Sequence, residues 1–184
     1  MIENIPCVIL SGGKSSRMGE DKSFLPFNNT TLIEYQYHRL SKIFTNVYIS
    51  SKINKFDFEC KIIYDNNKIF SPMVALYSIL KFLNSQVFII SVDTPFIKEE
   101  TIKDLVLNSK NFDLTIAKDS KKTHNLCGVY SCNCISYIEH LLNKDIHKIN
   151  LLVKNLNSNI VEYTDSTQFF NVNTKEDYKK ICQL

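Results

Sequence analysis

Short apolar runs alternate along the chain with longer segments in which apolar residues recur every three or four positions. The first run, Cys7–Leu10, is bounded by Pro6 and by Ser11-Gly12-Gly13. Apolar runs of this length between turn residues are typical of buried strands. Further strands are predicted at 47–50, 62–64, 87–92, 112–117 and 126–131, with weaker candidates at Val161 and 169–172.

The longer segments predict amphipathic helices at 31–44, 73–83, 98–108, 134–156 and 174–182. Thr31, followed three residues later by Glu34, has the form of a capping box at the start of the first helix. Pro72 suits the first turn of the second helix, and a break is expected near Asp145 in the fourth. Thr174 with Asp177 opens the last helix.

The alternation of strands and helices predicts a mainly parallel sheet with helices on both faces. The chain has 184 residues, of which 44% are apolar and 22% charged, as expected for a globular domain with a buried core. We therefore expect an α/β protein in which residues 1–184 form a single Rossmann-like, three-layer α/β/α domain.

Charge and hydropathy exclude several classes of protein. The net charge of +3, from 22 basic and 19 acidic residues, is too small to indicate binding to nucleic acid or to a membrane surface. No apolar stretch approaches the roughly 20 residues of a membrane span, and the N-terminus lacks the pattern of a signal peptide. Together with six cysteines that form no C-x-x-C pair, this predicts a cytoplasmic protein.

One group of metal-binding residue types falls within a short stretch. It comprises His124, Cys127, Cys132 and Cys134. Their spacing does not match the usual zinc patterns, and Cys127 lies in an apolar run that is predicted to be a strand. Buried or surface thiols are therefore favoured over a structural metal.

The loop after the first strand carries the groups that bind phosphate. Gly12-Gly13 permits a sharp turn that brings backbone N–H groups close to an anion. Lys14, Arg17 and Lys22 add three cations, which together suit a polyphosphate. A Walker A loop and the dinucleotide fingerprint G-x-G-x-x-G are both absent from this loop. The alternative is an ordinary surface turn with solvated charges.

Three segments resemble one known family. Residues 10–22 read L-S-G-G-K-S-S-R-M-G-E-D-K, residues 92–96 read V-D-T-P-F, and residues 171–177 read N-V-N-T-K-E-D. In this order they resemble the motifs of molybdenum cofactor guanylyltransferases, and the first more loosely resembles the G-x-x-x-R-M segment of nucleotide-sugar pyrophosphorylases. The resemblance spans nearly the whole chain and implies the nucleotide-diphospho-sugar transferase type of fold.

The resemblance implies a role for each matching position. Arg17 and Lys22 would hold the triphosphate and its developing charge, as the catalytic residues, and Asp93 would bind Mg²⁺. Nucleotide contacts would come from Leu10, Ser11, Gly12, Gly13, Lys22, Ser50, Asp65 and Asp93. The acceptor would face His124, Asn171 and Asn173. Simpler roles are a helix cap for Asp93, turn residues for Asp65 and the two asparagines, and a loop position for the histidine.

The chain departs from the family pattern at several positions. Ser50 stands where asparagine is common, which puts a nucleotide contact there in doubt. The segment 70–75 reads F-S-P-M-V-A, without the two glycines of the usual G-P-[LM]-x-G. Asn125 and Lys175 replace prolines. None of these departures touches Arg17 or Lys22.

The reaction implied by the resemblance joins GMP from GTP to the terminal phosphate of molybdopterin and releases pyrophosphate. A phosphate monoester, with a second pKa near ~6, is already ionised at neutral pH and needs no protein base. Rival interpretations are transfer from CTP, another acceptor such as a sugar or methylerythritol phosphate, or a nucleotide-binding scaffold without activity. We expect a monomer with GTP and molybdopterin as substrates, and transient contact with other molybdenum-cofactor proteins remains open.

Overall fold

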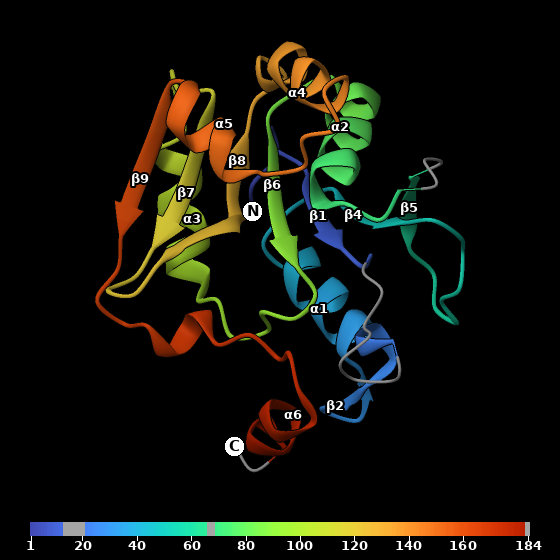
Figure 1. Ribbon diagram of the computed structural model, residues 1–184. Coiled ribbons are helices and arrows are strands. Elements are labelled where there is room, and N and C mark those ends of the chain that lie inside the picture. Colours follow the sequence, from blue (N-terminus) through green and yellow to red (C-terminus); the bar gives the residue numbers. More distant parts are fainter. Residues whose placement is uncertain (13–20, 66–68, 183–184) are drawn as a thin grey trace.

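The computed structural model describes residues 1–12, 21–65 and 69–182 of the chain. A sheet of seven strands forms its centre, and a small two-stranded hairpin lies beside the helix α6 (Figure 1). The sheet consists of β1 Cys7–Leu10, β4 Val47–Ser51, β5 Lys61–Tyr64, β6 Val87–Ser91, β7 Leu114–Lys118, β8 Thr123–Tyr130 and β9 Ser158–Glu162. The hairpin consists of β2 Pro26–Phe27 and β3 Thr30–Thr31.

Helices follow most of the strands, as the alternating pattern predicted. They are α1 Leu32–Ser41, α2 Pro72–Leu83, α3 Glu99–Leu107, α4 Cys134–Leu142, α5 Asn150–Asn155 and α6 Lys175–Ile181. Two short 3₁₀ turns, η1 Lys22–Phe24 and η2 Thr167–Phe169, lie in the connections. None of the helices in the described part of the chain is long and apolar enough to cross a membrane.

The sheet is mainly parallel, as predicted. Its strand order is β5-β4-β1-β6-β8-β7-β9, and only β8 runs antiparallel to its neighbours, β6 and β7. Within the parallel part, Ile9 of β1 lies opposite Ile49 of β4 on one side and Ile90 of β6 on the other. The carboxyl ends of β1, β4, β5 and β6 therefore meet at one edge, where ligands bind in sheets of this kind.

Two apolar clusters fill the space between the sheet and the helices, one on each face. Successive side chains of a strand point to opposite faces, so β1 contributes Cys7 and Ile9 to one cluster and Val8 and Leu10 to the other. The first cluster packs under α1, α3 and α6, and the second under α2, α4 and α5. This is the predicted three-layer α/β/α arrangement (Figure 1).

The predicted helix starts are confirmed by their capping contacts. The Thr31 hydroxyl accepts the N–H of Glu34 at 3.4 Å, and the Ser71 hydroxyl caps α2 by accepting the N–H of Met73 at 3.2 Å. Thr174 and Asp177 form a complete capping box at the start of α6. Each contact satisfies backbone donors that the first helical turn leaves without partners.

Two details of the sequence-based prediction are wrong. The predicted strand at 169–172 does not form, because Thr167–Phe169 is a 3₁₀ turn and residues 170–173 are irregular. The loop before α1 contains the hairpin β2–β3, which was not predicted. Its turn residues Asn28 and Asn29 have φ of 47° and 63°, values that asparagine tolerates better than most residues. The predicted break near Asp145 is confirmed.

Candidate functional site

Three adjoining cavities lie at the carboxyl edge of the sheet, and all three are lined by Ser91 and Leu126. The central cavity, about 210 Å³, lies between the end of β1 and the end of β6. The β5-side cavity, about 330 Å³, extends over β4 and β5 toward α2. The β8-side cavity, about 360 Å³, extends over β8. A continuous groove with a central compartment and two arms results.

Lys22 and Asp93, two predicted site residues, face each other in the central cavity. The Lys22 ammonium lies 3.6 Å from Oδ2 of Asp93 and donates a hydrogen bond of 2.8 Å to Oδ1 of Asn173. The Asn171 amide approaches Oδ1 of Asp93 at 3.5 Å. The side chains of Lys22 and Asp93 are each 16% exposed. The fold thus brings four predicted residues from three distant segments into one cluster.

A network of backbone contacts fixes the segment that carries Asp93. The Asp93 carbonyl accepts the N–H of Val172 at 2.9 Å, which joins the end of β6 to the C-terminal segment. The buried side-chain amide of Gln36 donates a hydrogen bond of 3.0 Å to the carbonyl of Thr94, the residue after Asp93. Arg39 of α1 donates to the carbonyl of Ile97 at 2.6 Å. Asp93 therefore stands on a loop held by α1 from one side and by residues 171–173 from the other.

Lys22 is held by contacts of the residues on either side of it. The Asp21 carboxylate accepts the N–H of Ser23 at 3.0 Å and forms an ion pair with Lys55. Burial raises the pKa of Asp21, but the bonds from Lys55 and Ser23 outweigh this effect and lower the pKa below its usual value. The Ser23 hydroxyl is 2.7 Å from that of Ser11. These contacts tie the start of η1 to the end of β1 and direct Lys22 into the groove.

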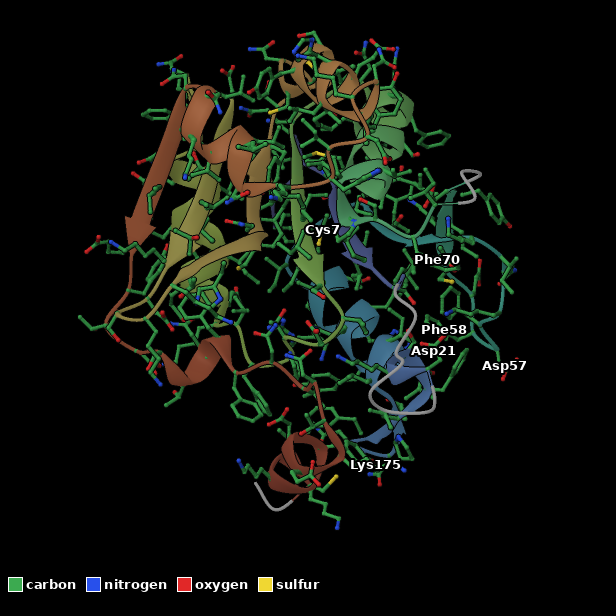
Figure 2. All side chains as sticks on the ribbon, in the orientation of Figure 1. Cys7, Asp21, Asp57, Phe58, Phe70 and Lys175 are labelled. Atoms are coloured by element: carbon green, nitrogen blue, oxygen red, sulfur yellow. The ribbon has the colours of Figure 1, made fainter. Side chains whose placement is uncertain are left out.

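The β5-side cavity is lined by four residues with a predicted nucleotide contact. They are Leu10, Gly12, Ser50 and Asp65. Two further lining residues, Lys52 and Phe70, were not predicted from the sequence. Lys52 forms an ion pair of 3.0 Å with Asp65, and Phe70 directly precedes the capped start of α2 (Figure 2). Lys52 stands in no motif, and Phe70 begins the segment 70–75 that departs from the family pattern, so the sequence assigned neither residue a role.

The β8-side cavity contains polar atoms that have no partner within the described chain. Its lining includes His124, Asn125 and Asn171, and a buried atom of each, Nε2, Oδ1 and Oδ1 respectively, forms no hydrogen bond there. An unpaired buried polar atom costs roughly 1–3 kcal/mol. A ligand with matching polar groups would remove that cost, so this arm suits a polar molecule. Asn173, by contrast, points to Lys22 rather than into this cavity.

His124, which lines the same cavity, stacks on the ring of Phe169. Its ring lies 4.2 Å from that of Phe169, nearly parallel, and its Nε2 is 3.3 Å from Oδ2 of Asp119 in a poorly aligned contact. Burial lowers the pKa of His124, and the Asp119 carboxylate only partly opposes this effect. The neutral imidazole is therefore favoured at pH 7.

Cys127 and Cys134, two of the cysteines near His124 in the sequence, are protonated thiols. Burial raises the pKa of Cys127 and of Cys134 to about 12, and the Cys134 thiol donates to the carbonyl of Asp113 at 3.2 Å. Cys7 lies in the middle of the sheet (Figure 2). Within the described ranges, no three His, Cys, Asp or Glu side chains lie close enough together to hold a metal ion. The zinc alternative therefore finds no support in this part of the chain.

Two predicted phosphate-binding residues, Gly13 and Arg17, lie outside the described residues, as does Lys14. What the structure does describe is the two ends of their loop. Ser11 and Gly12 follow β1, and Asp21 and Lys22 enter η1, and all four line the central cavity. The predicted phosphate loop therefore begins and ends at the groove.

Comparison with known proteins agrees with this geometry. Residues 7–158 match the family described as the MobA-like NTP transferase domain. The chain is 42% identical over 183 residues to the molybdenum cofactor guanylyltransferase of Campylobacter jejuni subsp. jejuni serotype O:6, covering 97% of this chain and 96% of the relative. The Helicobacter pylori protein of the same name is 33% identical over 192 residues, covering 100% and 94%.

A solved structure supports the assignment of the fold. Molybdopterin-guanine dinucleotide biosynthesis protein A from Archaeoglobus fulgidus matches with a TM-score of 0.84 and 21% identity, over 97% of this chain and 99% of that one. The chain belongs to the MobA-like NTP transferase family and, within it, to the molybdenum cofactor guanylyltransferases.

Proposed function

We propose that the chain transfers GMP from GTP to the terminal phosphate of molybdopterin, releasing pyrophosphate and forming the molybdopterin guanine dinucleotide. The names of its relatives supply the substrates of this proposal. The observation that carries it is the position of Lys22 and Asp93, 3.6 Å apart in the central cavity between two larger arms. A cation and a carboxylate there can act on phosphates that arrive from both sides.

In this proposal the triphosphate lies in the central cavity. Lys22 contacts its phosphates, together with Arg17 from the loop between Gly12 and Asp21. Two anionic phosphates must approach each other in the reaction, so cations at this point lower the barrier by neutralising charge. The Asn173 carbonyl oxygen, bonded to Lys22 at 2.8 Å, restricts where the ammonium group can lie.

Asp93 would hold Mg²⁺. Asp93 lines the central and β8-side cavities, and its contacts with Lys22 and Asn171 are long, at 3.6 and 3.5 Å, so lone pairs remain for a hard cation. Mg²⁺ commonly takes one or two protein carboxylates and completes its octahedron with substrate phosphates and water. When bound, the ion supplies positive charge beside the phosphates during transfer.

The two arms fit the two remaining parts of the substrates. The guanosine would occupy the β5-side cavity, where Leu10, Gly12, Ser50 and Asp65 line the wall. Molybdopterin would occupy the β8-side cavity, where one buried polar atom each of His124, Asn125 and Asn171 forms no hydrogen bond among the described residues. The terminal phosphate of the acceptor would then meet the α-phosphate of GTP near Asp93. Positioning two ionised phosphates in line is the main task, since no proton must be removed.

Nucleotide selectivity tests the proposal. With Mg²⁺ present, GTP at a hundredfold excess over its Kd should stabilise the protein by ~2.7 kcal/mol, which raises Tm by about 5–10 °C for a chain of this size. CTP at the same concentration should produce a much smaller shift. Equal shifts with the two nucleotides would favour a transferase of other specificity, and no shift with either would contradict nucleotide binding.

We further propose that the protein acts in the cytoplasm as a monomer, with transient contact to proteins that supply molybdopterin or receive the product. What supports this is the modest net charge of +3 and the six cysteines without a C-x-x-C pair. Sedimentation of the purified protein would test the monomer, and a constant mass of about 21.3 kDa is expected over a wide concentration range.

A further inference from the structure

The β5-side cavity contains a lysine to which the family motifs give no role. Lys52 follows β4 directly, and its ammonium group lies 3.0 Å from Oδ2 of Asp65 and 3.2 Å from the carbonyl of Ile69. The same group is 4.7 Å from the centre of the Phe70 ring. Lys52, Asp65 and Phe70 all line this cavity. A cation, a carboxylate and an aromatic ring therefore meet at one end of it.

These contacts give the Lys52 side chain a defined position. The side chain is 23% exposed, and that of Asp65 is 8% exposed. A lysine on an open surface samples many rotamers, whereas here the carboxylate, the carbonyl and the ring restrict the ammonium group together. An ammonium group has no fixed hydrogen-bonding plane, so a ligand oxygen can replace the carbonyl of Ile69 as one of its acceptors.

We propose that Lys52 determines base specificity by donating a hydrogen bond to O6 of guanine, while Asp65 accepts from N1–H and the 2-amino group. This inference rests on the proposed function. Guanine presents an acceptor, O6, next to two donors, whereas cytosine presents a donor, the 4-amino group, next to two acceptors. An ammonium group beside a carboxylate offers one donor next to two acceptors. The Lys52–Asp65 pair is therefore complementary to guanine and not to cytosine.

Phe70 completes this end of the cavity. Its ring is 52% exposed, and Lys52 lies over one of its faces. An exposed aromatic ring beside a cavity can cover the flat face of a base. The nearby ammonium group of Lys52 attracts the π-system of the Phe70 ring. In this proposal Lys52 and Asp65 contact the edge of the purine, and Phe70 contacts its face. The triphosphate would lie at the other end of the groove, beside Lys22.

Nucleotide analogues test the role of Lys52 in the full chain with Mg²⁺. Titration calorimetry would give Kd for GTP, for 6-thioguanosine triphosphate, whose sulfur is a poor acceptor in place of O6, and for inosine triphosphate, which lacks the 2-amino group. The wild type should bind both analogues more weakly than GTP. In Lys52→Met, GTP should lose about ten- to a hundredfold in affinity, the range of a hydrogen bond to a charged group.

The pattern across analogues separates a direct contact from an indirect one. If Lys52 binds O6, Lys52→Met and Lys52→Ala should bind GTP and the thio analogue equally, yet still prefer GTP over inosine triphosphate through Asp65. If the Lys52 variants lost the same factor in affinity for GTP and for the thio analogue, the wild-type preference for GTP over the thio analogue would remain. That result would overturn the inference. Absence of GTP binding by the wild type would instead contradict the proposed function.

Lys61→Met is the matched control. Lys61 also pairs with a polar oxygen, Oδ1 of Asn46 at 2.9 Å, and lies 5.7 Å from the Tyr48 ring, but it does not line any of the three cavities. Its removal should leave all three Kd values unchanged. A comparable loss of GTP affinity in this variant would show a general effect of lost positive charge and would overturn the specific role of Lys52.

Discussion

The ammonium group of Lys22 lies 3.6 Å from the carboxylate of Asp93, although Lys22 follows β1 and Asp93 follows β6, 71 positions later in the chain. Each group neutralises part of the charge of the other. A triphosphate with its cation would offer both groups better partners, since phosphate oxygens suit the lysine and the cation suits the aspartate. The pair therefore marks where the charges of the reaction meet.

Replacing Lys22 tests its part in charge stabilisation. Lys22→Ala should lower kcat by roughly 10²–10³, the usual cost of one group that acts mainly on the transition state. Thermal unfolding should show that the variant is folded, because Lys22 is part-exposed and packs in no core cluster. Lys179→Ala, on the exposed face of α6, serves as the control and should retain full activity. Wild-type turnover in Lys22→Ala would exclude the proposed role.

Replacing Asp93 tests the magnesium site. Asp93→Asn keeps the shape of the side chain but removes its negative charge, so the Mg²⁺ concentration for half-maximal rate should rise at least tenfold and kcat should fall by roughly 10²–10³. Rate measurements over a Mg²⁺ titration would show both effects. If the variant had the same Mg²⁺ dependence as the wild type, Asp93 would not be a ligand of the ion.

Substitution by alanine should lower stability at Gly128 but not at Gly12, the two glycines that the structure describes. A Cβ on Gly128 would lie 2.2 Å from the Thr115 carbonyl oxygen and 2.8 Å from Cα of Ile116, inside the sheet. Gly128→Ala should therefore lower the free energy of unfolding by roughly 3 kcal/mol, near the upper end of overpacking effects. Chemical denaturation would measure this loss.

A Cβ on Gly12 meets no atom within 4 Å among the described residues, and Gly12 lines both the central and the β5-side cavity. Gly12→Ala should keep the stability of the wild type and bind GTP about tenfold more weakly, because the methyl group occupies space that the nucleotide needs. Tm and Kd measured on the same sample would check both expectations. Reduced stability with normal binding would contradict the position of the nucleotide in this groove.

Stability should depend on pH through His124. Because burial lowers its pKa below the usual 6.5, the unfolded chain binds this proton more readily than the folded one. Its contribution to stability is complete above about pH 6.5 and is lost as pH falls through the lower pKa of the folded state. The free energy of unfolding should therefore decrease from pH 7 to pH 5, and less so in His124→Gln. Identical slopes in the two proteins would contradict the buried neutral state.

The direction of β8 shows what periodicity alone could not provide. Both β7 and β8 were expected as strands, but alternation of strands and helices suggests parallel pairing everywhere. The connection between them, residues 119–122, is a tight turn in which the Asp119 carboxylate accepts the N–H groups of Lys121 and Lys122. A connection this short permits only antiparallel pairing, since a parallel crossover needs about a dozen residues or more. The shortness of this turn was the feature of the sequence that could have predicted the antiparallel direction of β8.

The site was predictable where motifs mark it and not elsewhere. Lys22, Asp93, Asn171 and Asn173 stand in recognisable segments, and the fold brings them together. Lys52 and Phe70 resemble ordinary surface residues in the sequence, because their significance comes from contacts across the β4–β5 and β5–α2 connections. The contact between Lys22 and Asn173, 151 positions apart, likewise follows from the path of the C-terminal segment rather than from a local pattern.

Pyrophosphate release tests the proposed activity most directly. Purified protein with Mg²⁺, GTP and molybdopterin should release pyrophosphate in step with formation of a guanine dinucleotide that mass spectrometry identifies. Omission of molybdopterin, or replacement of GTP by CTP, should reduce the rate to background. Release that does not require molybdopterin, or that is equally fast with CTP, would contradict the proposed transfer of GMP across the groove at Lys22 and Asp93.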